Sequence, residues 1–226
     1  MKVRLVQTSI LAKEGRWDID YHLPPEGIRQ FPAERLALVS ELADVIKYQR
    51  DPSSKPDDPF LYVDIASVDV DTGAISNPQE LTGAEAPSRA RKVIRTNDVL
   101  VSTVRPTRGA VAVVPEDLDN QICSTGFTVL RCKDQVNPHY LHFVLRLSST
   151  REQFRKFSTG SSYPAILDAD VLRTLVPKSS LEEGDSIART VVNALRERNK
   201  RVKEANEELT KTLQEVESRL KTDLPT

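Results

Sequence analysis

The sequence predicts an α+β fold: a mostly antiparallel twisted sheet with flanking helices, followed by a long C-terminal coiled-coil helix. Short β-branched runs separated by turn residues predict the sheet, and they read "FLYVDIASVDV", "DVLVSTV", "AVAVV" and "GFTVLRC". A periodic apolar pattern that no proline interrupts between residues 181 and 221 predicts the helix. We therefore expect a globular domain at residues 1–178 and a long dimerisation or spacer helix at residues 179–226.

Helices are expected on both sides of the strand-rich middle. The run "FPAERLALVSELADVIKY" has Pro32 at a helix start and one apolar stripe, which comprises Leu36, Val39, Leu42, Val45 and Ile46. After the strands, Asn137 and Pro138 begin another helical run, and "TREQFRKF" continues the pattern. A short final strand, "LVPKSS", and a capping box of Ser180 and Glu183 then lead into the long helix.

The composition is that of an ordinary soluble globular protein, with 226 residues of which 38% are hydrophobic and 29% charged. No run of 18 apolar residues could span a bilayer, and the N-terminus lacks the apolar segment and cleavage site of a signal peptide. We therefore expect a cytoplasmic protein. Cys123 and Cys132 would lie on opposite faces of one strand and are expected to be free thiols.

The long helix carries a narrow apolar stripe. Its positions are spaced by 4, 4, 7, 7, 4, 3 and 4 residues, and they are Ile187, Val191, Leu195, Val202, Leu209, Leu213, Val216 and Leu220. At about 1.5 Å per residue the helix would be on the order of 60 Å long. A stripe this narrow on so long a helix indicates pairing with a second helix. The alternative is that the helix packs back on its own domain.

Charge is unevenly distributed, although the net charge is only −1. Residues 51–83 carry one Lys against seven acidic residues, whereas residues 84–173 carry thirteen Lys and Arg against nine acidic residues. The basic region includes a cluster made of Arg89, Arg91, Lys92, Arg95, Arg105 and Arg108. A net charge near zero therefore does not exclude a nucleic-acid partner. A solvated basic surface is the alternative.

Eight pieces of sequence occur in an order that resembles one half of the specificity subunit of type I restriction-modification systems. They are "RWDIDYHLP", "FLYVDIASVDVDTGAI", "RTNDVLVSTVRPTRGAVAVV", "STGFTVLR", "NPHYLHFVL", "STGSSYPAIL", "LRTLVPK" and the long terminal helix. The resemblance covers residues 16–220, and it implies a target recognition domain that reads double-stranded DNA, followed by a conserved helix. In that family, paired helices set the distance between two half-sites and dock the methyltransferase (modification) subunits. The resemblance thus implies a homodimer through the C-terminal helix, and it leaves open a nuclease or translocase partner.

The chain departs from the family pattern at two places. Asn97 stands before Asp98 where the family often has glycine, and asparagine can adopt the positive φ that this turn needs. Tyr163 stands where many relatives have glutamine, which leaves the target base unpredictable.

A small, hydroxyl-rich loop is the expected contact with DNA. Its hydroxyls and backbone N–H groups would meet phosphate oxygens, Gly160 would permit close approach, and Pro164 would fix the exit. The predicted DNA-binding residues are Arg89, Arg91, Lys92, Arg105, Arg108, Arg155, Lys156, Thr159, Gly160, Ser161, Ser162 and Tyr163, with Arg151 one turn before Arg155. We assign Arg89, Arg91 and Lys92 to phosphates, and Arg105, Arg108 and Tyr163 to a groove. A plain polar loop is the alternative.

The sequence predicts no enzyme, no cofactor and no metal site. Asp64 is followed by "IAS" instead of the lysine that a common nuclease motif requires, and "SNPQ" lacks the aromatic residue of an amino-methyltransferase. No glycine-rich loop follows a strand. His139 and His142 lack an evident third ligand. A second functional hypothesis is a coiled-coil adaptor or antagonist of a restriction system that does not itself bind DNA.

Overall fold

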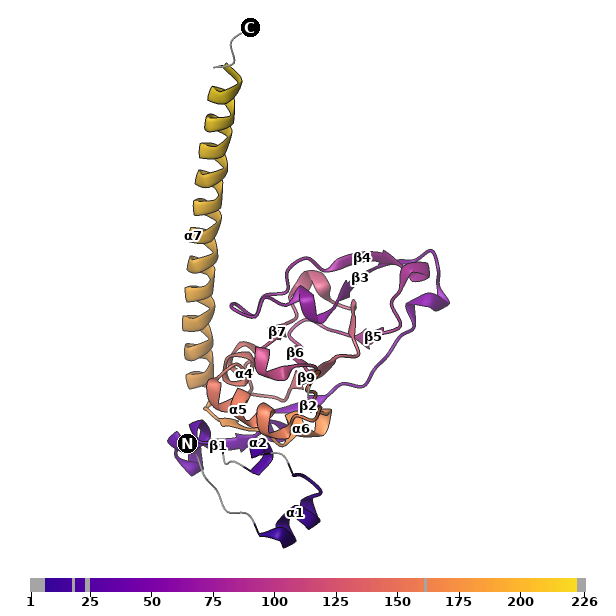
Figure 1. Cartoon of the computed structure of the whole chain (residues 1–226), viewed down its shortest axis with the longest axis vertical. Helices are drawn as coiled ribbons and strands as arrows, with labels where there is room; N and C mark the ends of the chain where they lie inside the picture. The colour runs from indigo at the N-terminus through magenta and orange to yellow at the C-terminus, as the bar shows by residue number, and fades with distance from the viewer. Residues whose placement is uncertain (1–6, 18, 23–24, 161, 223–226) are drawn as a thin grey trace. The chain divides into compact units, whose positions relative to one another are not determined.

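The computed structural model describes residues 7–17, 19–22, 25–160 and 162–222. The chain forms two compact units, one through Asp185 and the other from Ser186 onward. The second unit is the greater part of a single uninterrupted helix, α7 (Leu181–Thr222), as Figure 1 shows. No helix in the described ranges is both long and apolar enough to cross a membrane.

Two four-stranded sheets dominate the first unit. One has the order β2-β9-β6-β7 and is antiparallel throughout, with β2 at Ala43–Val45, β6 at Val99–Ser102, β7 at Val111–Val113 and β9 at Phe127–Cys132. The other has the order β4-β3-β8-β5, with β3 at Pro59–Val63, β4 at Gln79–Thr82, β5 at Ala90–Val93 and β8 at Ile122–Ser124. Only the β3–β8 pair in these sheets is parallel. The predicted α+β fold with a mostly antiparallel sheet is confirmed.

The two sheets share one hydrophobic core. Val63 and Cys123 from the second sheet pack in the same buried cluster as Leu100 and Val129 from the first, around the fully buried Phe127. All four residues of β6 are buried, so its first three residues, Val99, Leu100 and Val101, are all apolar and do not alternate with polar residues. Both thiols are free; Cys123 is on β8 and Cys132 on β9, so they do not share a strand as the sequence suggested.

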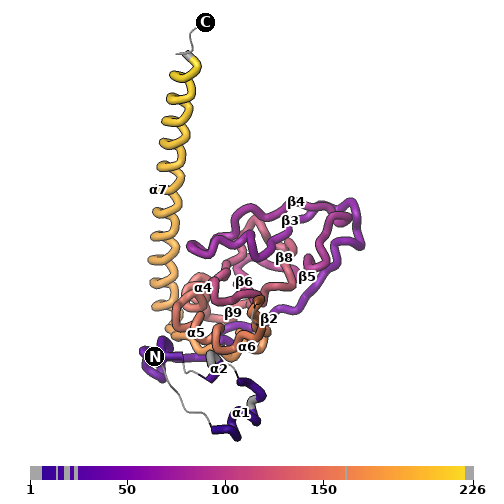
Figure 2. Tube along the Cα trace, viewed as in Figure 1, coloured from indigo at the N-terminus to yellow at the C-terminus, as the bar shows by residue number. Residues whose placement is uncertain are grey.

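Helices lie at the opposite end of this unit from β3 and β4, as the tube in Figure 2 shows. They are α1 (Thr8–Glu14), α2 (Ile19–His22), α3 (Val39–Leu42), α4 (Pro138–Leu145), α5 (Ser148–Phe157) and α6 (Asp168–Leu172). Short 3₁₀ turns are η1 (Gly27–Gln30), η2 (Ala33–Arg35), η3 (Pro52–Ser54), η4 (Ile65–Ser67), η5 (Gly83–Glu85), η6 (Pro106–Arg108) and η7 (Glu116–Leu118). Helix α4 packs against β6, β7 and β9, and α5 packs against α4.

The expected starts of α4 and α7 are confirmed. The Asn137 side chain accepts hydrogen bonds from the backbone N–H of His139 at 2.9 Å and of Tyr140 at 3.3 Å, and Pro138 is the first residue of α4. Ser180 Oγ accepts from the N–H of Glu183 at 3.3 Å, so it caps α7. The Asn97 turn is left-handed as expected, with φ of 69°.

The helix predicted from "FPAERLALVSELADVIKY" is wrong. Only α3, four residues long, is α-helical there; the 3₁₀ turn η2 and then β1 (Leu36–Leu38) precede it, and β2 follows it. Strand β1 pairs with β10 (Leu175–Pro177) in a two-stranded sheet, and β2 pairs with β9. Distant strands therefore satisfy the backbone of these segments, and this tertiary pairing overrides a weak local preference for helix.

Candidate nucleic-acid interface

Two loops far apart in the sequence are joined by backbone hydrogen bonds, and we call residues 103–109 and 158–166 the paired loops. The N–H of Arg105 donates to the carbonyl of Pro164 at 2.7 Å, and the N–H of Ile166 donates to that of Thr103 at 2.9 Å. Ala165 bridges to both Val104 and Thr159, so the second loop is a closed hairpin held against the first. The predicted hydroxyl-rich loop and the segment that carries Arg105 and Arg108 are thus one structural element.

The tip of the hairpin is exposed and tightly turned. Gly160 has φ of 90°, a conformation that favours glycine, and a Cβ at this position would crowd the carbonyl oxygen of Tyr163 at 3.1 Å. Thr159, Ser162 and Tyr163 are exposed, whereas Ser161 lies outside the described residues. The tip therefore presents small polar groups and one aromatic ring to solvent.

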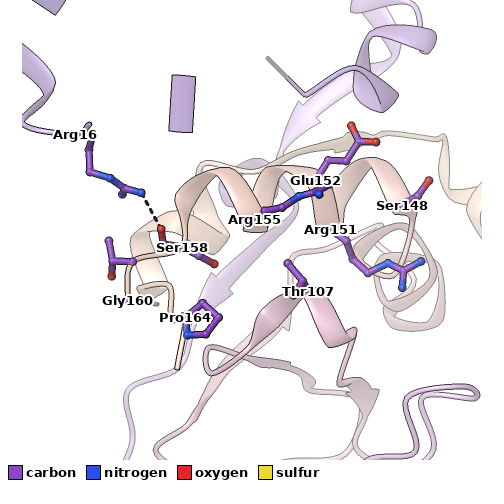
Figure 3. Close-up of a pocket in the computed structure, with 10 residues that line it drawn as sticks. Arg16, Thr107, Ser148, Arg151, Glu152, Arg155, Ser158, Gly160 and Pro164 are labelled. Atoms are coloured by element: carbon purple, nitrogen blue, oxygen red, sulfur yellow. Dashed lines mark hydrogen bonds between the residues drawn. The ribbon is translucent and has the colours of Figure 1, made fainter. Parts of the chain in front are cut away.

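A hollow of about 940 Å³ lies on one side of the paired loops (Figure 3). It is lined by Arg16, Thr107, Ser148, Arg151, Glu152, Arg155, Ser158, Thr159, Gly160 and Pro164. Arg151 and Arg155 come from successive turns of α5, so both guanidinium groups are near the same face. Glu152 Oε2 accepts from the backbone N–H of Gly27 at 2.9 Å, and Figure 3 shows its carboxylate on the other side of α5 from Arg151. The hollow is therefore basic.

Arg16 lies at the edge of this hollow, and sequence reasoning did not select it. Its guanidinium donates to the carbonyl of Ser158 at 2.7 Å and to that of Phe157 at 3.4 Å, and it lies 4.6 Å from the centre of the Tyr21 ring. Lys156 lies 5.7 Å from the same ring centre. A single arginine 142 residues from its partner carries no local signal, so only the fold could reveal this contact.

A second hollow, of about 500 Å³, lies on the other side of the paired loops. Its lining comprises Tyr62, Asp64, Ile65, Ala66, Val68, Val70, Arg89, Val104, Arg105, Arg108, Ala110, Ser124 and Tyr163. Burial is the main cause that raises the pKa of Tyr62, so this phenol stays protonated and can donate as well as accept hydrogen bonds. Thr107 and Gly160 line the first hollow while Arg105 and Tyr163 line the second, so the paired loops separate the two.

Arg105 and Tyr163 form a cation–π pair within the paired loops. The guanidinium carbon lies 4.6 Å from the centre of the tyrosine ring, and Nη2 donates to the carbonyl of Ser162 at 3.3 Å. Arg105 has φ of 48° and ψ of 51°, a left-handed conformation, and it directly precedes Pro106. This conformation is uncommon for a residue other than glycine, and α-type conformations are further disfavoured before proline.

Apart from Lys156, which lies near the Tyr21 ring, the predicted cations divide into two groups by what they contact. Arg91 pairs with Asp51 at 3.4 Å and donates to the carbonyl of Ala90 at 2.9 Å. Lys92, whose side chain is only 12% exposed, donates to the carbonyl of Phe127 at 2.6 Å. Within the described ranges, five other arginines that line the two hollows have no carboxylate partner: Arg89, Arg105, Arg108, Arg151 and Arg155. The charges of the second group face the two hollows.

Comparison with known proteins gives relatives of one kind, although no family model matches the chain. It is 35% identical over 95 residues to the type I restriction enzyme HindI specificity subunit of Haemophilus influenzae, covering 41% of this chain and 20% of that protein. It superimposes on the crystal structure of the HsdS subunit from Thermoanaerobacter tengcongensis with a TM-score of 0.66 and 40% identity, covering 80% of this chain and 47% of that one.

A second solved structure comes from work on complex assembly and conformational transition of the type I R-M system. It has a TM-score of 0.65 and 39% identity, and the match covers 84% of this chain and 49% of that one. The chain therefore spans about half the length of the solved relatives and a fifth of the curated one. In sequence and fold it is similar to type I restriction-modification specificity subunits, over about half the length of each solved one.

Proposed function

We propose that this chain recognises a DNA sequence as the specificity component of a type I-like restriction-modification system and directs a DNA methyltransferase subunit to its site. The observation that carries the proposal is the set of five arginines without carboxylate partners in the described residues, gathered on the two hollows that flank the paired loops. In the same domain, Arg35, Arg91, Arg95, Arg131 and Arg173 each pair with a carboxylate. We assign the chain no catalytic role of its own.

The chemistry of this surface suits a duplex. Guanidinium groups bind phosphate oxygens through two parallel hydrogen bonds, and small residues at the hairpin tip let a backbone come near. Duplex DNA carries one negative charge per about 1.7 Å of its axis, so arginines spread along both hollows can each meet a phosphate or a base edge. We leave Arg91 and Lys92 out of the interface because Asp51, Phe127 and Asp168 already engage them.

Salt-dependent binding tests this proposal. The full chain is titrated against a random-sequence duplex at several salt concentrations, as wild type and with Arg151→Ala plus Arg155→Ala. Each neutralised phosphate contributes about 0.9 to the slope of log K against log salt, so the double variant should lower that slope by about 1.8. The matched control is Arg35→Ala plus Arg95→Ala, which removes the same charge from two arginines that are paired with Glu183 and Asp119.

Two results would overturn the proposal. One is a wild-type chain that binds no duplex at low salt, which would favour the adaptor or antagonist hypothesis. The other is a control variant in which the slope of log K against log salt falls as much as in the double variant. Removing any two arginines would then weaken binding equally, wherever they lie on the domain.

We further propose that two copies of the chain pair through α7. Five apolar side chains of the predicted stripe are exposed in the second unit: Val202, Leu209, Leu213, Val216 and Leu220. Exposed apolar residues at coiled-coil spacing favour burial against another helix. Because the chain spans about half of each solved relative, two copies would supply the length of one such protein. A symmetric pair implies a DNA site made of two inverted half-sites with a fixed gap.

A further inference from the structure

Arg105 has a backbone conformation that its neighbours must enforce. A non-glycine residue at φ of 48° before a proline is strained, and strain of this kind persists only where surrounding contacts fix the residue. Three contacts from the hairpin do so: the bond from its N–H to Pro164, the bond from Nη2 to Ser162, and the cation–π contact with Tyr163. Both the backbone and the guanidinium group of Arg105 are therefore held by contacts from the other loop.

A guanidinium group held in place has a specific use at a DNA surface. A bidentate contact to the O6 and N7 atoms of guanine requires the two donors of the arginine fork to lie in the plane of the base. A phosphate contact is less demanding, because phosphate oxygens accept from many directions. Arg89 and Arg108 line the same hollow, yet in the described parts of the chain no hydrogen bond, ion pair or ring contact holds either guanidinium in place.

We infer that Arg105 reads a guanine in the major groove and that Tyr163 is the residue that positions it. This inference rests on the proposed function. Tyr163 acts through its ring face, which carries the guanidinium, and not through a base contact of its own. The hairpin thus sets sequence preference indirectly, by orienting an arginine that belongs to the other loop.

The test uses the full chain and duplexes selected by the wild type from a pool with a randomised centre. Each guanine of the selected sequence is replaced in turn by 7-deazaguanine, which keeps base pairing and removes only the N7 acceptor. One such replacement should weaken wild-type binding by about fivefold or more, which corresponds to about 1 kcal/mol. The same replacement should leave the affinity of Arg105→Ala unchanged, because the contact is already lost.

Variants at Tyr163 and Arg105 separate positioning from charge. Tyr163→Phe keeps the ring and should keep the dependence on that guanine, whereas Tyr163→Ala should lose it although Arg105 is present. Arg105→Lys keeps the charge without the planar fork, so it should bind DNA at low salt without the guanine dependence. Arg108→Ala removes one charge from the same turn and should weaken binding while the dependence persists. Thermal unfolding of each variant confirms that it is folded.

The inference fails if no guanine of the selected sequence responds to the replacement, or if Arg105→Ala and 7-deazaguanine act additively at every guanine. It also fails if Tyr163→Ala keeps the full guanine dependence. Failure of the proposed function looks different: the wild type then selects no sequence from the pool, or binds no duplex at all.

Discussion

Arg131 on β9 holds both carboxylate oxygens of Asp98, with Nε 2.8 Å from Oδ1 and Nη2 3.0 Å from Oδ2. Asp98 is 1% exposed, and its Oδ2 also accepts from the backbone N–H of Arg95 at 2.8 Å. Three donors thus satisfy a buried charge directly after the left-handed Asn97. The contact ties the turn before β6 to a neighbouring strand of the same sheet.

Asp98→Asn should destabilise the domain. The amide cannot accept at both positions, so one donor loses its partner in a buried site, while the half-exposed Arg131 can still turn to water. We expect a loss of about 1–3 kcal/mol in the free energy of unfolding, measured by urea titration. Asp119→Asn, which changes an exposed acid paired with Arg95, is the control and should cost much less. Equal losses would contradict a special role for Asp98.

His142 should make stability depend on pH. Burial is the main cause that lowers its pKa from 6.5 to about 4, with Arg146 adding to the effect, and its Nε2–H donates to the carbonyl of Val111 at 3.1 Å. The unfolded chain binds a proton below pH 6.5 and the folded chain does not until about pH 4. The stability that the fold gains by keeping His142 neutral is therefore fully present above pH 6.5 and is lost as pH falls toward 4.

The shift corresponds to about 3 kcal/mol at most. His142→Gln removes the titrating group and should flatten the fall in stability across this window, measured by urea unfolding at successive pH values. His139→Gln, on the same helix, is the comparison, and its free energy of unfolding should still fall with pH nearly as much as that of the wild type. An unchanged profile in His142→Gln would exclude His142 as the cause.

Gly73→Ala should destabilise the domain far more than Gly15→Ala. Both glycines have positive φ, 73° and 63°, so each substitution meets a similar backbone penalty of about 1 kcal/mol. A Cβ at Gly73 would also lie 2.1 Å from His142 Nε2 and 2.8 Å from the carbonyl oxygen of Val111, whereas nothing lies within 4 Å at Gly15. The overlap should add about 1–3 kcal/mol. Similar melting temperatures for the two variants would contradict this packing.

Replacing Leu209 and Leu213 together by Glu should abolish association through α7. Both side chains are exposed and lie on the apolar stripe, so pairing of two helices would bury them. Burying two glutamate carboxylates at these positions would cost free energy and oppose pairing. Light scattering at micromolar concentration should give the mass of two chains for the wild type and of one for the variant. Lys203→Ala plus Glu207→Ala, which removes an exposed i,i+4 pair, should leave the mass unchanged. A monomeric wild type would refute the proposed pairing.

Local signals made much of this fold predictable. Asn137 followed by Pro138 started α4, the positive φ of Asn97 followed from its side chain, and the β-branched runs marked β3, β6, β7 and β9. Each of these depends on residues within a few positions in the chain, because caps and turns are satisfied by near neighbours. The long helix was predictable for the same reason, since its period repeats along one segment.

Long-range contacts decided the rest. Residues 36–45 became two strands around one helical turn because β9 and β10, more than 80 residues away, supply their hydrogen-bond partners. Lys92 in β5 is engaged by Phe127 and Asp168, whereas Arg89, which directly precedes β5, lines the second hollow. The amino-acid sequence determines which groups are charged and which turns are left-handed. Only tertiary structure determines which charges are already neutralised, because the carboxylates and carbonyls that engage them come from distant parts of the chain.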